Sequence, residues 1–348
     1  QKRLNYNMHY LYFFAGTFIA SWLITLLIKK IAVHYGILDY PGEERKIHSV
    51  ATPLLGGAAI FISFCIALIV GNTYILSGSL QWHHWIGVLM GSLILMIGGA
   101  LDDIKRLKPG TQLIFPVLAA LAVVGGGVGI EKITDPSGGF LYLSSLTAPF
   151  TIVWLIGMSY TTKLLDGIDG LVSSIGLVGS LVIFLFTLTT RWYQPDIAFA
   201  ALMLAAACCG FLVLNWHPAK IFLGDGGSLF IGFMLGVLSI ISGGKIAIAL
   251  LIMGVPILDV AWTILRRLLK GKNPFKSADR QHLHFRLLDA GLGQRATVLV
   301  FCLTSAIFGL SGLFLQSKGK VYSLVALTIV MLAIITLFAF LDNRKKTS

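Results

Sequence analysis

Aspartates beside glycines mark the ends of three long apolar stretches in this sequence. One pair closes a stretch, a second pair closes another, and a single aspartate opens a third: Asp102, Asp103, Asp166, Asp169 and Asp225. Glycine lets a backbone approach a ligand closely, and ionisable groups at membrane depth are costly and usually functional. Carboxylates gathered in one place need a divalent cation, or nearby Lys and Arg residues, to neutralise them. Oxygen-only ligands favour Mg²⁺ or Mn²⁺ together with substrate phosphates, so the pattern predicts such a metal. Their spacing would place Asp166 and Asp169 on one helix face.

Two long polar segments supply the opposite charge to these carboxylates. Each carries basic residues and histidines: Arg45, Lys46 and His48 in the first segment, and Arg280, His282 and His284 in the second. Histidines flanked by arginines, with no cysteine or third histidine nearby, suit an anionic phosphate better than zinc. Alternatively, the second segment is an amphipathic interfacial helix that anchors the loop. Carboxylates, basic loops and a lipid-bathed surface together indicate phosphoryl transfer between a soluble nucleotide and a lipid.

Membrane-spanning helices are the elements expected to position these residues. Of the 348 residues, 56% are hydrophobic and 12% are charged, which is about half the charged share of a soluble domain. A span needs roughly 20 mostly apolar residues. The segments that qualify are 10–28, 54–71, 84–101, 112–129, 149–165, 170–189, 197–214, 228–242, 244–264, 296–315 and 321–340. We expect an all-α polytopic membrane protein with about eleven spans, or ten because 149–165 and 228–242 are short or Gly-interrupted, in one domain over 1–348.

The positions of the basic residues predict the orientation of this domain. Most of the 27 Lys and Arg residues fall in or beside five loops and the C-terminal tail, and basic residues favour the cytoplasm. The loops are 30–53, 102–111, 163–170, 215–227 and 265–295. We therefore expect a periplasmic or extracellular N-terminus, a cytoplasmic C-terminus, and a site on the cytoplasmic face of a bacterial inner membrane. The net charge of +12 then reflects topology and an affinity for anionic headgroups and nucleotide phosphates, with no need for nucleic acid.

Five motifs, in this order, resemble the polyprenyl-phosphate N-acetylhexosamine-1-phosphate transferase family. They are Arg45-Lys46-Ile47-His48 with Gly56-Gly57, Asp102-Asp103, Asp166-Gly167-Ile168-Asp169-Gly170-Leu171, the stretch from Asn215 to Ser228, and His282-Leu283-His284. The resemblance covers about residues 36–300 and is nearer to the GlcNAc-type branch. It implies transfer of an N-acetylhexosamine 1-phosphate, with GlcNAc the first expectation, from a UDP-sugar to undecaprenyl phosphate. UMP is released, and the product starts a cell-surface polysaccharide such as lipopolysaccharide or teichoic acid.

The resemblance also implies roles for individual residues. Asp225 would be the principal Mg²⁺ ligand, and Asp166 would stand near the metal or the uridine with Asp169. The catalytic set is Asp102, Asp103, Asp166, Asp169, His282 and His284, and the substrate-binding set is Arg45, Lys46, His48, Lys163, Asn215, Lys220 and Arg280. Relatives form dimers, and a homodimer is compatible with the family although no residue here requires it.

Charge neutralisation is the central chemical task of such a transfer. A phosphate monoester has a second pKa of about 6, so the lipid phosphate is largely ionised at neutral pH and needs no strong general base. Bringing one anion to another is harder, so positioning and electrostatics dominate. We expect direct attack of the lipid phosphate on the β-phosphorus, and a covalent aspartyl-phosphate on Asp102 or Asp103 is the alternative.

Four positions depart from the family pattern. Tyr160 and Lys163 replace common asparagines, Gln112 stands where relatives often have Lys, and Phe285 stands where many have a third His. A protonated ammonium cannot coordinate Mg²⁺. We expect either an active divergent enzyme, in which Lys163 pairs with Asp166 or Asp225 or touches the diphosphate, or a weakened metal site or a non-catalytic paralogue. Our hypothesis is that Lys163 supplies part of the charge that the metal would otherwise supply.

Three other functions fit parts of the sequence. The first is the phospho-MurNAc-pentapeptide transferase of peptidoglycan synthesis, which substrate competition distinguishes. The second is a cation-coupled transporter, although a transporter places its carboxylates near mid-bilayer and these lie at helix ends. The third is a scaffold that binds a UDP-sugar without turnover.

Overall fold

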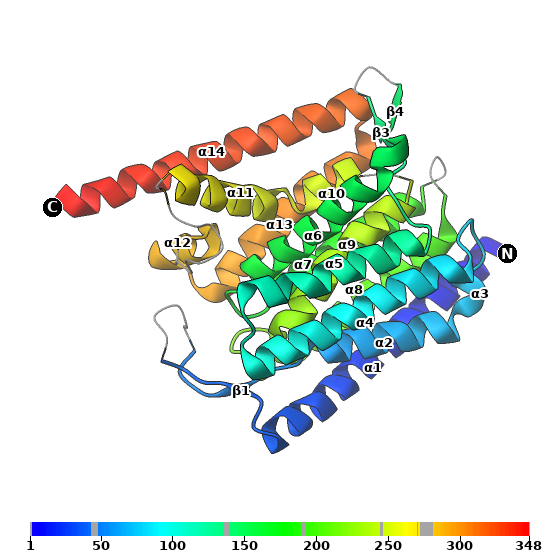
Figure 1. The fold of residues 1–348 in the computed structure, drawn as a ribbon, viewed down its shortest axis with the longest axis horizontal. Coiled ribbons are helices and arrows are strands. Elements are labelled where there is room, and N and C mark those ends of the chain that lie inside the picture. The colour runs from blue at the N-terminus through cyan, green and yellow to red at the C-terminus, as the bar shows by residue number, and fades with distance from the viewer. Residues whose placement is uncertain are drawn as a thin grey trace.

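Long helices running side by side make up nearly all of the fold (Figure 1). This computed structural model describes residues 2–42, 48–135, 139–189, 193–243, 246–269, 271 and 281–347. Arg45, Lys46 and Arg280, which the sequence places in the substrate site, lie outside the described residues. The N-terminus and the C-terminus lie at opposite ends of the bundle (Figure 1).

Each apolar segment expected to span the membrane contains a helix. The long helices are α1 (Lys2–His34), α2 (Gly57–Val70), α4 (Trp82–Lys105), α5 (Pro109–Gly125), α6 (Thr147–Leu165), α7 (Leu171–Thr187), α8 (Pro195–Asn215), α9 (Gly224–Ile241), α13 (Gln294–Phe314) and α14 (Ser317–Thr347). Segment 244–264 corresponds to two helices, α10 (Ile246–Ile252) and α11 (Gly254–Leu269), with a bend of 78° between them.

Short elements connect these helices. They are α3 (Asn72–Ile75), α12 (Leu283–Asp289), the 3₁₀ turn Ser144–Leu146, and the strands β1 (Leu38–Asp39), β2 (Thr52–Pro53), β3 (Lys132–Thr134) and β4 (Phe140–Tyr142). The strands form two antiparallel pairs, β1 with β2 and β3 with β4. The pairs stand at opposite ends of the bundle (Figure 1).

Length and apolarity identify several helices as candidate membrane spans. Within the described part of the chain, five helices qualify: Met8–His34 of α1, α4, α8, α9 and α13. The bent pair α10–α11 makes a sixth if it is counted as one span, and α2, α5 and α7 are shorter apolar helices. The prediction of an all-α polytopic membrane protein is therefore confirmed, while the number eleven stays a prediction.

Two helices, α8 and α9, form the centre of the bundle. Their most apolar windows are 83% and 89% buried, whereas that of α1 is 17% buried. The helix α8 packs between α1 and α7, and α9 packs between α4 and α6. A helix that is apolar all round belongs in the interior, so the N-terminus of α9, which carries Asp225, is held by the most enclosed part of the fold.

Glycine pairs let other helix ends approach α9 at backbone distance. A Cβ added to Gly57 would overlap the backbone of Gly227, and one added to Gly99 would overlap the backbone of Gly226. The segment before α2 also pairs with the segment before α9, since the N–H of Gly57 donates to the carbonyl of Leu223 at 2.7 Å. Small residues permit such close packing in membranes, and here they bring the end of α4 beside the start of α9.

Replacing Gly99 by alanine should therefore separate α4 from α9. We expect Gly99→Ala to lower the thermal midpoint of the purified protein by several degrees, because overpacking costs about 1–3 kcal/mol. Gly157→Ala is the matched control, since Gly157 is also helical but nothing lies within 4 Å of its added Cβ. Equal midpoints for the two variants would contradict the close approach of α4 and α9.

Candidate active site

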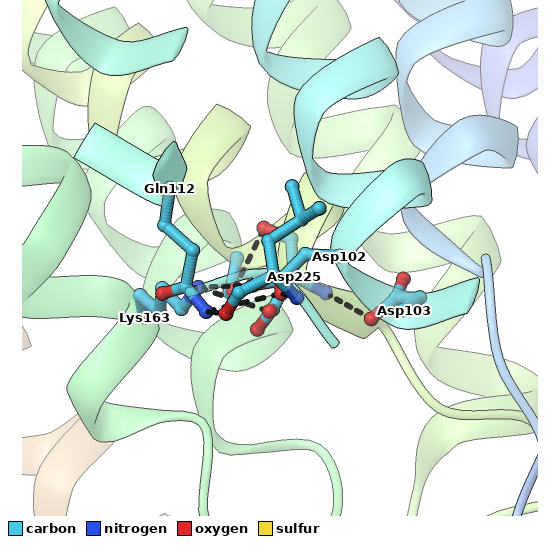
Figure 2. Close-up of polar contacts among 7 residues, drawn as sticks. Asp102, Asp103, Gln112, Lys163 and Asp225 are labelled. Carbon is cyan, nitrogen blue, oxygen red and sulfur yellow. Dashed lines mark hydrogen bonds and ion pairs between the residues drawn. The ribbon is translucent and has the colours of Figure 1, made fainter. Parts of the chain in front are cut away.

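The described site residues gather at one end of the bundle. The C-terminal ends of α4 and α6 meet the N-terminal ends of α5 and α9 there, and β1 and α12 lie at the same end (Figure 1). Figure 2 shows side chains from these four helices converging: Asp102, Asp103, Gln112, Lys163 and Asp225. We predicted that four other aspartates lie at the same helix ends as Asp225, and all four do: Asp102, Asp103, Asp166 and Asp169. Asp169 makes different contacts from the others.

An ammonium group lies between two of the carboxylates. Lys163 Nζ donates to Oδ2 of Asp102 and to Oδ2 of Asp225, at 2.9 Å each, and to Oε1 of Gln112 at 3.1 Å (Figure 2). The Lys163 and Asp102 side chains are 16% and 6% exposed, and that of Asp225 is 31% exposed. The expected pairing of Lys163 with Asp225 is observed, and Asp102 is a second partner that the sequence did not indicate.

Asp102 is held by protein donors on both oxygens. Its Oδ1 accepts from the backbone N–H of Leu107 at 2.8 Å and from Nε2 of Gln112 at 3.0 Å, while Oδ2 faces Lys163. The left-handed conformation of Arg106 (φ 50°) ends α4, after which the Leu107 N–H reaches back to Asp102. Asp102 thus joins the end of α4 to the start of α5.

Asp103 anchors the beginning of α9. Its Oδ1 accepts from the backbone N–H of Asp225 at 3.0 Å. The first N–H groups of a helix lack intrahelical partners, and a carboxylate near them is favoured by the helix dipole. Asp103 therefore caps α9 from the neighbouring helix and sets the position of the Asp225 backbone.

The residues Asp166 and Asp169 lie in a turn between α6 and α7, so the prediction that they share a helix face is wrong. The helix α6 ends at Leu165, and α7 begins only after Gly170, whose φ of 77° is typical of glycine. Asp166 is solvent-exposed. Limited hydration and repulsion from Asp225 and Asp169 raise its pKa above the ordinary value. Because Asp166 is exposed, we weigh the repulsion more heavily, and it is the part that a bound cation would relieve.

Asp169 clamps the segment that leads into α9. Its Oδ2 lies 2.7 Å from Nδ1 of His217 and accepts from the N–H of Ala219 at 3.0 Å. Arg295 Nε donates to the carbonyl of His217 at 2.9 Å. His217 thus has a structural contact with one of the predicted catalytic carboxylates.

A buried aspartate orients the first histidine of the His-Leu-His motif. Asp259 of α11 lies with Oδ2 at 2.8 Å from Nδ1 of His282, and its Oδ1 accepts from the N–H of Leu283 at 2.8 Å. The His282 and His284 rings stack at 5.6 Å with planes 7° apart. Asp259 was not among the predicted site residues, although a lone carboxylate inside an apolar segment is a signal for function.

His284 is enclosed against the turn that carries the Asp-Gly-Ile-Asp motif. Its side chain is fully buried, neither ring nitrogen has a hydrogen-bond partner in the described structure, and Nε2 faces Gly167. Burial, reinforced by the neighbouring His282, lowers the pKa of His284 to about 3. The ring is neutral at physiological pH, so it could offer a phosphate one N–H but no charge.

The remaining described substrate-site residues have different surroundings. His48 lies 3.6 Å from Oδ2 of Asp39 and packs edge-on against Phe222, which precedes Asp225 by three residues. Asn215 is buried and structural, because it accepts from Ser173 Oγ at 2.8 Å and donates to the Ile221 carbonyl at 3.0 Å. The side chain of Lys220 is exposed, in the segment between α8 and α9.

The donor set bears on how a metal could bind. Among the described residues, no group of three or more His, Cys, Asp or Glu side chains could hold a metal ion. Lys163 fills the position between Asp102 and Asp225. Mg²⁺ often uses one or two carboxylates plus substrate phosphates, and the exposed Asp166, which is repelled by Asp225, fits this mode. The structure thus fits a substrate-assisted metal and not a cage made only of protein ligands.

These features define a class of protein: a polytopic membrane protein whose helix ends carry a polar, carboxylate-rich site. A profile described as Glycosyl transferase family 4 matches residues 85–243. The chain is 32% identical to a probable undecaprenyl-phosphate N-acetylglucosaminyl 1-phosphate transferase of Bacillus subtilis, over 95% of this chain and 92% of that protein. It is 30% identical to a decaprenyl-phosphate N-acetylglucosaminephosphotransferase of Mycolicibacterium smegmatis, over 93% and 86%.

A further relative is the undecaprenyl-phosphate alpha-N-acetylglucosaminyl 1-phosphate transferase of Escherichia coli K12, which is 28% identical over 91% of this chain and 86% of that protein. This similarity spans both the apolar helices and the polar site. The chain belongs to the polyprenyl-phosphate N-acetylhexosamine-1-phosphate transferase family, and the resemblance inferred from its motifs is confirmed.

Removing the Asp259 carboxylate should misorient His282. We expect Asp259→Asn to lower kcat by about 10- to 100-fold, the range typical when the orienting partner of a functional histidine is lost, with KM little changed. The asparagine still offers an oxygen to Leu283 but no charge to His282. Asp196→Asn is the control, because Asp196 is equally buried but begins α8 at the other end of the bundle. An unchanged kcat in Asp259→Asn would show that the pair has no functional role.

His284 should make the protein less stable in acid. Because its folded pKa lies below the unfolded value of about 6.5, the unfolded state binds a proton first, and stability is lost as pH falls below about 6.5. We expect the thermal midpoint to drop between about pH 7.5 and about pH 5, and to drop less in His284→Gln. His34→Gln, at an exposed histidine, should keep the wild-type pH dependence. If His284→Gln also keeps the wild-type pH dependence, the buried neutral ring is not the source of that dependence.

Proposed function

We propose that the protein transfers N-acetylglucosamine 1-phosphate from UDP-GlcNAc to undecaprenyl phosphate, with release of UMP, and so starts a cell-surface polysaccharide. The observation that carries this proposal is the position of the site. Carboxylates and one ammonium lie at the ends of apolar helices, where a lipid-borne phosphate and a water-soluble nucleotide can meet. The names of the curated relatives supply the sugar and the lipid.

The proposal includes a topology. Eleven membrane passes would begin outside the cytoplasm and end inside it, with the site on the cytoplasmic face of the bacterial inner membrane. An odd number of passes places the two termini on opposite sides, which agrees with their positions at opposite ends of the bundle (Figure 1). The site lies at the end that also holds the C-terminus, in keeping with the basic residues expected in the cytoplasm.

Direct attack is the mechanism that the Asp102 contacts favour. An oxygen of the lipid phosphate would form a bond to the β-phosphorus of UDP-GlcNAc, and the bond from that phosphorus to the bridging oxygen would break, so that UMP leaves with the electron pair. A covalent aspartyl-phosphate needs a carboxylate oxygen free to attack. Both Asp102 oxygens are engaged by Leu107, Gln112 and Lys163, and Asp103 is committed to the start of α9.

A Mg²⁺ ion, or Mn²⁺ in its place, is part of the proposal. Asp225 and Asp166 would hold it together with the sugar-nucleotide diphosphate, since Asp166 is exposed and repelled by Asp225. The ion would neutralise charge on the phosphates as the leaving group departs. His282, oriented by Asp259, and the exposed Lys220 would contribute donors to the same anions.

The test is UMP release by the purified full-length protein. With UDP-GlcNAc and undecaprenyl phosphate in detergent or nanodiscs, we expect release that requires the lipid phosphate and falls about 100-fold or more in Asp225→Asn. UDP-MurNAc-pentapeptide should neither replace nor compete with UDP-GlcNAc. UDP-sugar binding without turnover would contradict the proposal in favour of a scaffold, and cation flux in liposomes lacking lipid phosphate would favour a transporter.

A further inference from the structure

We propose that Lys163 is a built-in cation that holds Asp102 and Asp225 together in the place of a divalent ion, and so assembles the site before any metal or substrate binds. The inference rests on the proposed function, because it assigns a positioning residue to that reaction. It extends the hypothesis that Lys163 supplies part of the charge of a metal, and it replaces the substrate contact that was also expected for this residue.

The donors of Lys163 are fully used within the protein. A lysine ammonium has three N–H donors, and Nζ has three acceptors at hydrogen-bonding distance: Asp102 Oδ2 at 2.9 Å, Asp225 Oδ2 at 2.9 Å and Gln112 Oε1 at 3.1 Å. None is left for a substrate phosphate in this arrangement. Lys163 therefore acts on the reaction through the carboxylates that it joins.

The space between Asp102 and Asp225 does not fit a metal while Lys163 occupies it. A divalent ion there would have to displace an ammonium that touches both carboxylates. It would also find the other Asp102 oxygen already accepting from Leu107 and Gln112. Any metal must then bind Asp225 on the side away from Lys163, toward Asp166. The charges of Asp102 and Asp225 are neutralised by the protein itself, through Lys163.

Gln112 explains how the ammonium is kept in this position. Its Nε2 donates to Asp102 at 3.0 Å and to the Leu107 carbonyl at 2.9 Å, which leaves Oε1 facing Lys163. The amide thus has one orientation that satisfies all its neighbours. Because Oε1 lies 3.1 Å from Nζ, a lysine at position 112 could place its ammonium close to the same point, and the two residues form an exchangeable pair.

The experiment compares three variants of the full-length protein with the wild type, in EDTA and in Mg²⁺. Lys163→Met removes the charge and keeps most of the side-chain length. The double variant Lys163→Gln with Gln112→Lys moves the ammonium from α6 to α5. Lys105→Met is the matched control, because Lys105 is an exposed lysine at the same end of the bundle. The readouts are the thermal midpoint, measured with Mg²⁺ alone, and the Mg²⁺ dependence of UMP release.

We expect the wild type and Lys105→Met to have the same thermal midpoint in EDTA as in Mg²⁺. Lys163→Met should melt several degrees lower in EDTA and recover in Mg²⁺, because the ion can then enter between the two carboxylates. Its UMP release should fall about tenfold or more and need more Mg²⁺ than the wild type. The double variant should regain the wild-type midpoint and most of the activity.

Three outcomes would overturn the proposal. One is a Lys163→Met protein that matches the wild type in midpoint and in Mg²⁺ dependence. Another is a wild type that Mg²⁺ alone stabilises as strongly as it stabilises Lys163→Met. The third is a double variant that fails to fold or to turn over, which would show that the ammonium is not exchangeable between positions 163 and 112. This third outcome tests the proposal even if Lys163→Met does not fold. The midpoint comparison needs no turnover, so it stands even if UDP-GlcNAc is not the substrate.

Discussion

The structure of this site depends on one ammonium placed between a buried carboxylate, Asp102, and a partly exposed one, Asp225. Asp102 and Asp225 come from different helices, and without Lys163 their charges would repel at close range. Removing one partner of such a pair leaves a charge uncompensated, and the cost rises with the burial of that charge. Because Lys163 belongs to α6 and Gln112 to α5, this contact joins four helix ends, and the close packing at Gly99 and Gly57 gives the helices the approach that the contact requires.

Much of the fold follows from the sequence because membrane helices are specified locally. A run of apolar residues long enough to cross the hydrocarbon core must form a helix to satisfy its own backbone, and each segment chosen on that basis contains a helix. The bend of 78° between α10 and α11 was not foreseen, since the apolar run is continuous through Met253 and Gly254. The turn that holds Asp166 and Asp169 was also misassigned, although Gly167 and Gly170 are a local signal for it.

The sequence predicted which residues belong to the candidate site better than it predicted the contacts among them. The aspartates Asp102, Asp103 and Asp225 could be grouped because helix ends on one side of a membrane lie at one level. Their partners could not be derived, since the bond of Asp103 to α9 and that of His282 to Asp259 join residues 122 and 23 positions apart. Asn215 has the right motif but a structural role, because its amide is used up by Ser173 and Ile221.

A structure of the full-length protein with Mn²⁺ and UDP-GlcNAc, recorded at the manganese absorption edge, tests the central claim most directly. The anomalous signal locates the metal independently of the side chains. We predict an anomalous peak on the side of Asp225 away from Lys163, toward Asp166, with Lys163 still bonded to both Asp102 and Asp225. A peak between Asp102 and Asp225, with Lys163 turned away, would contradict it.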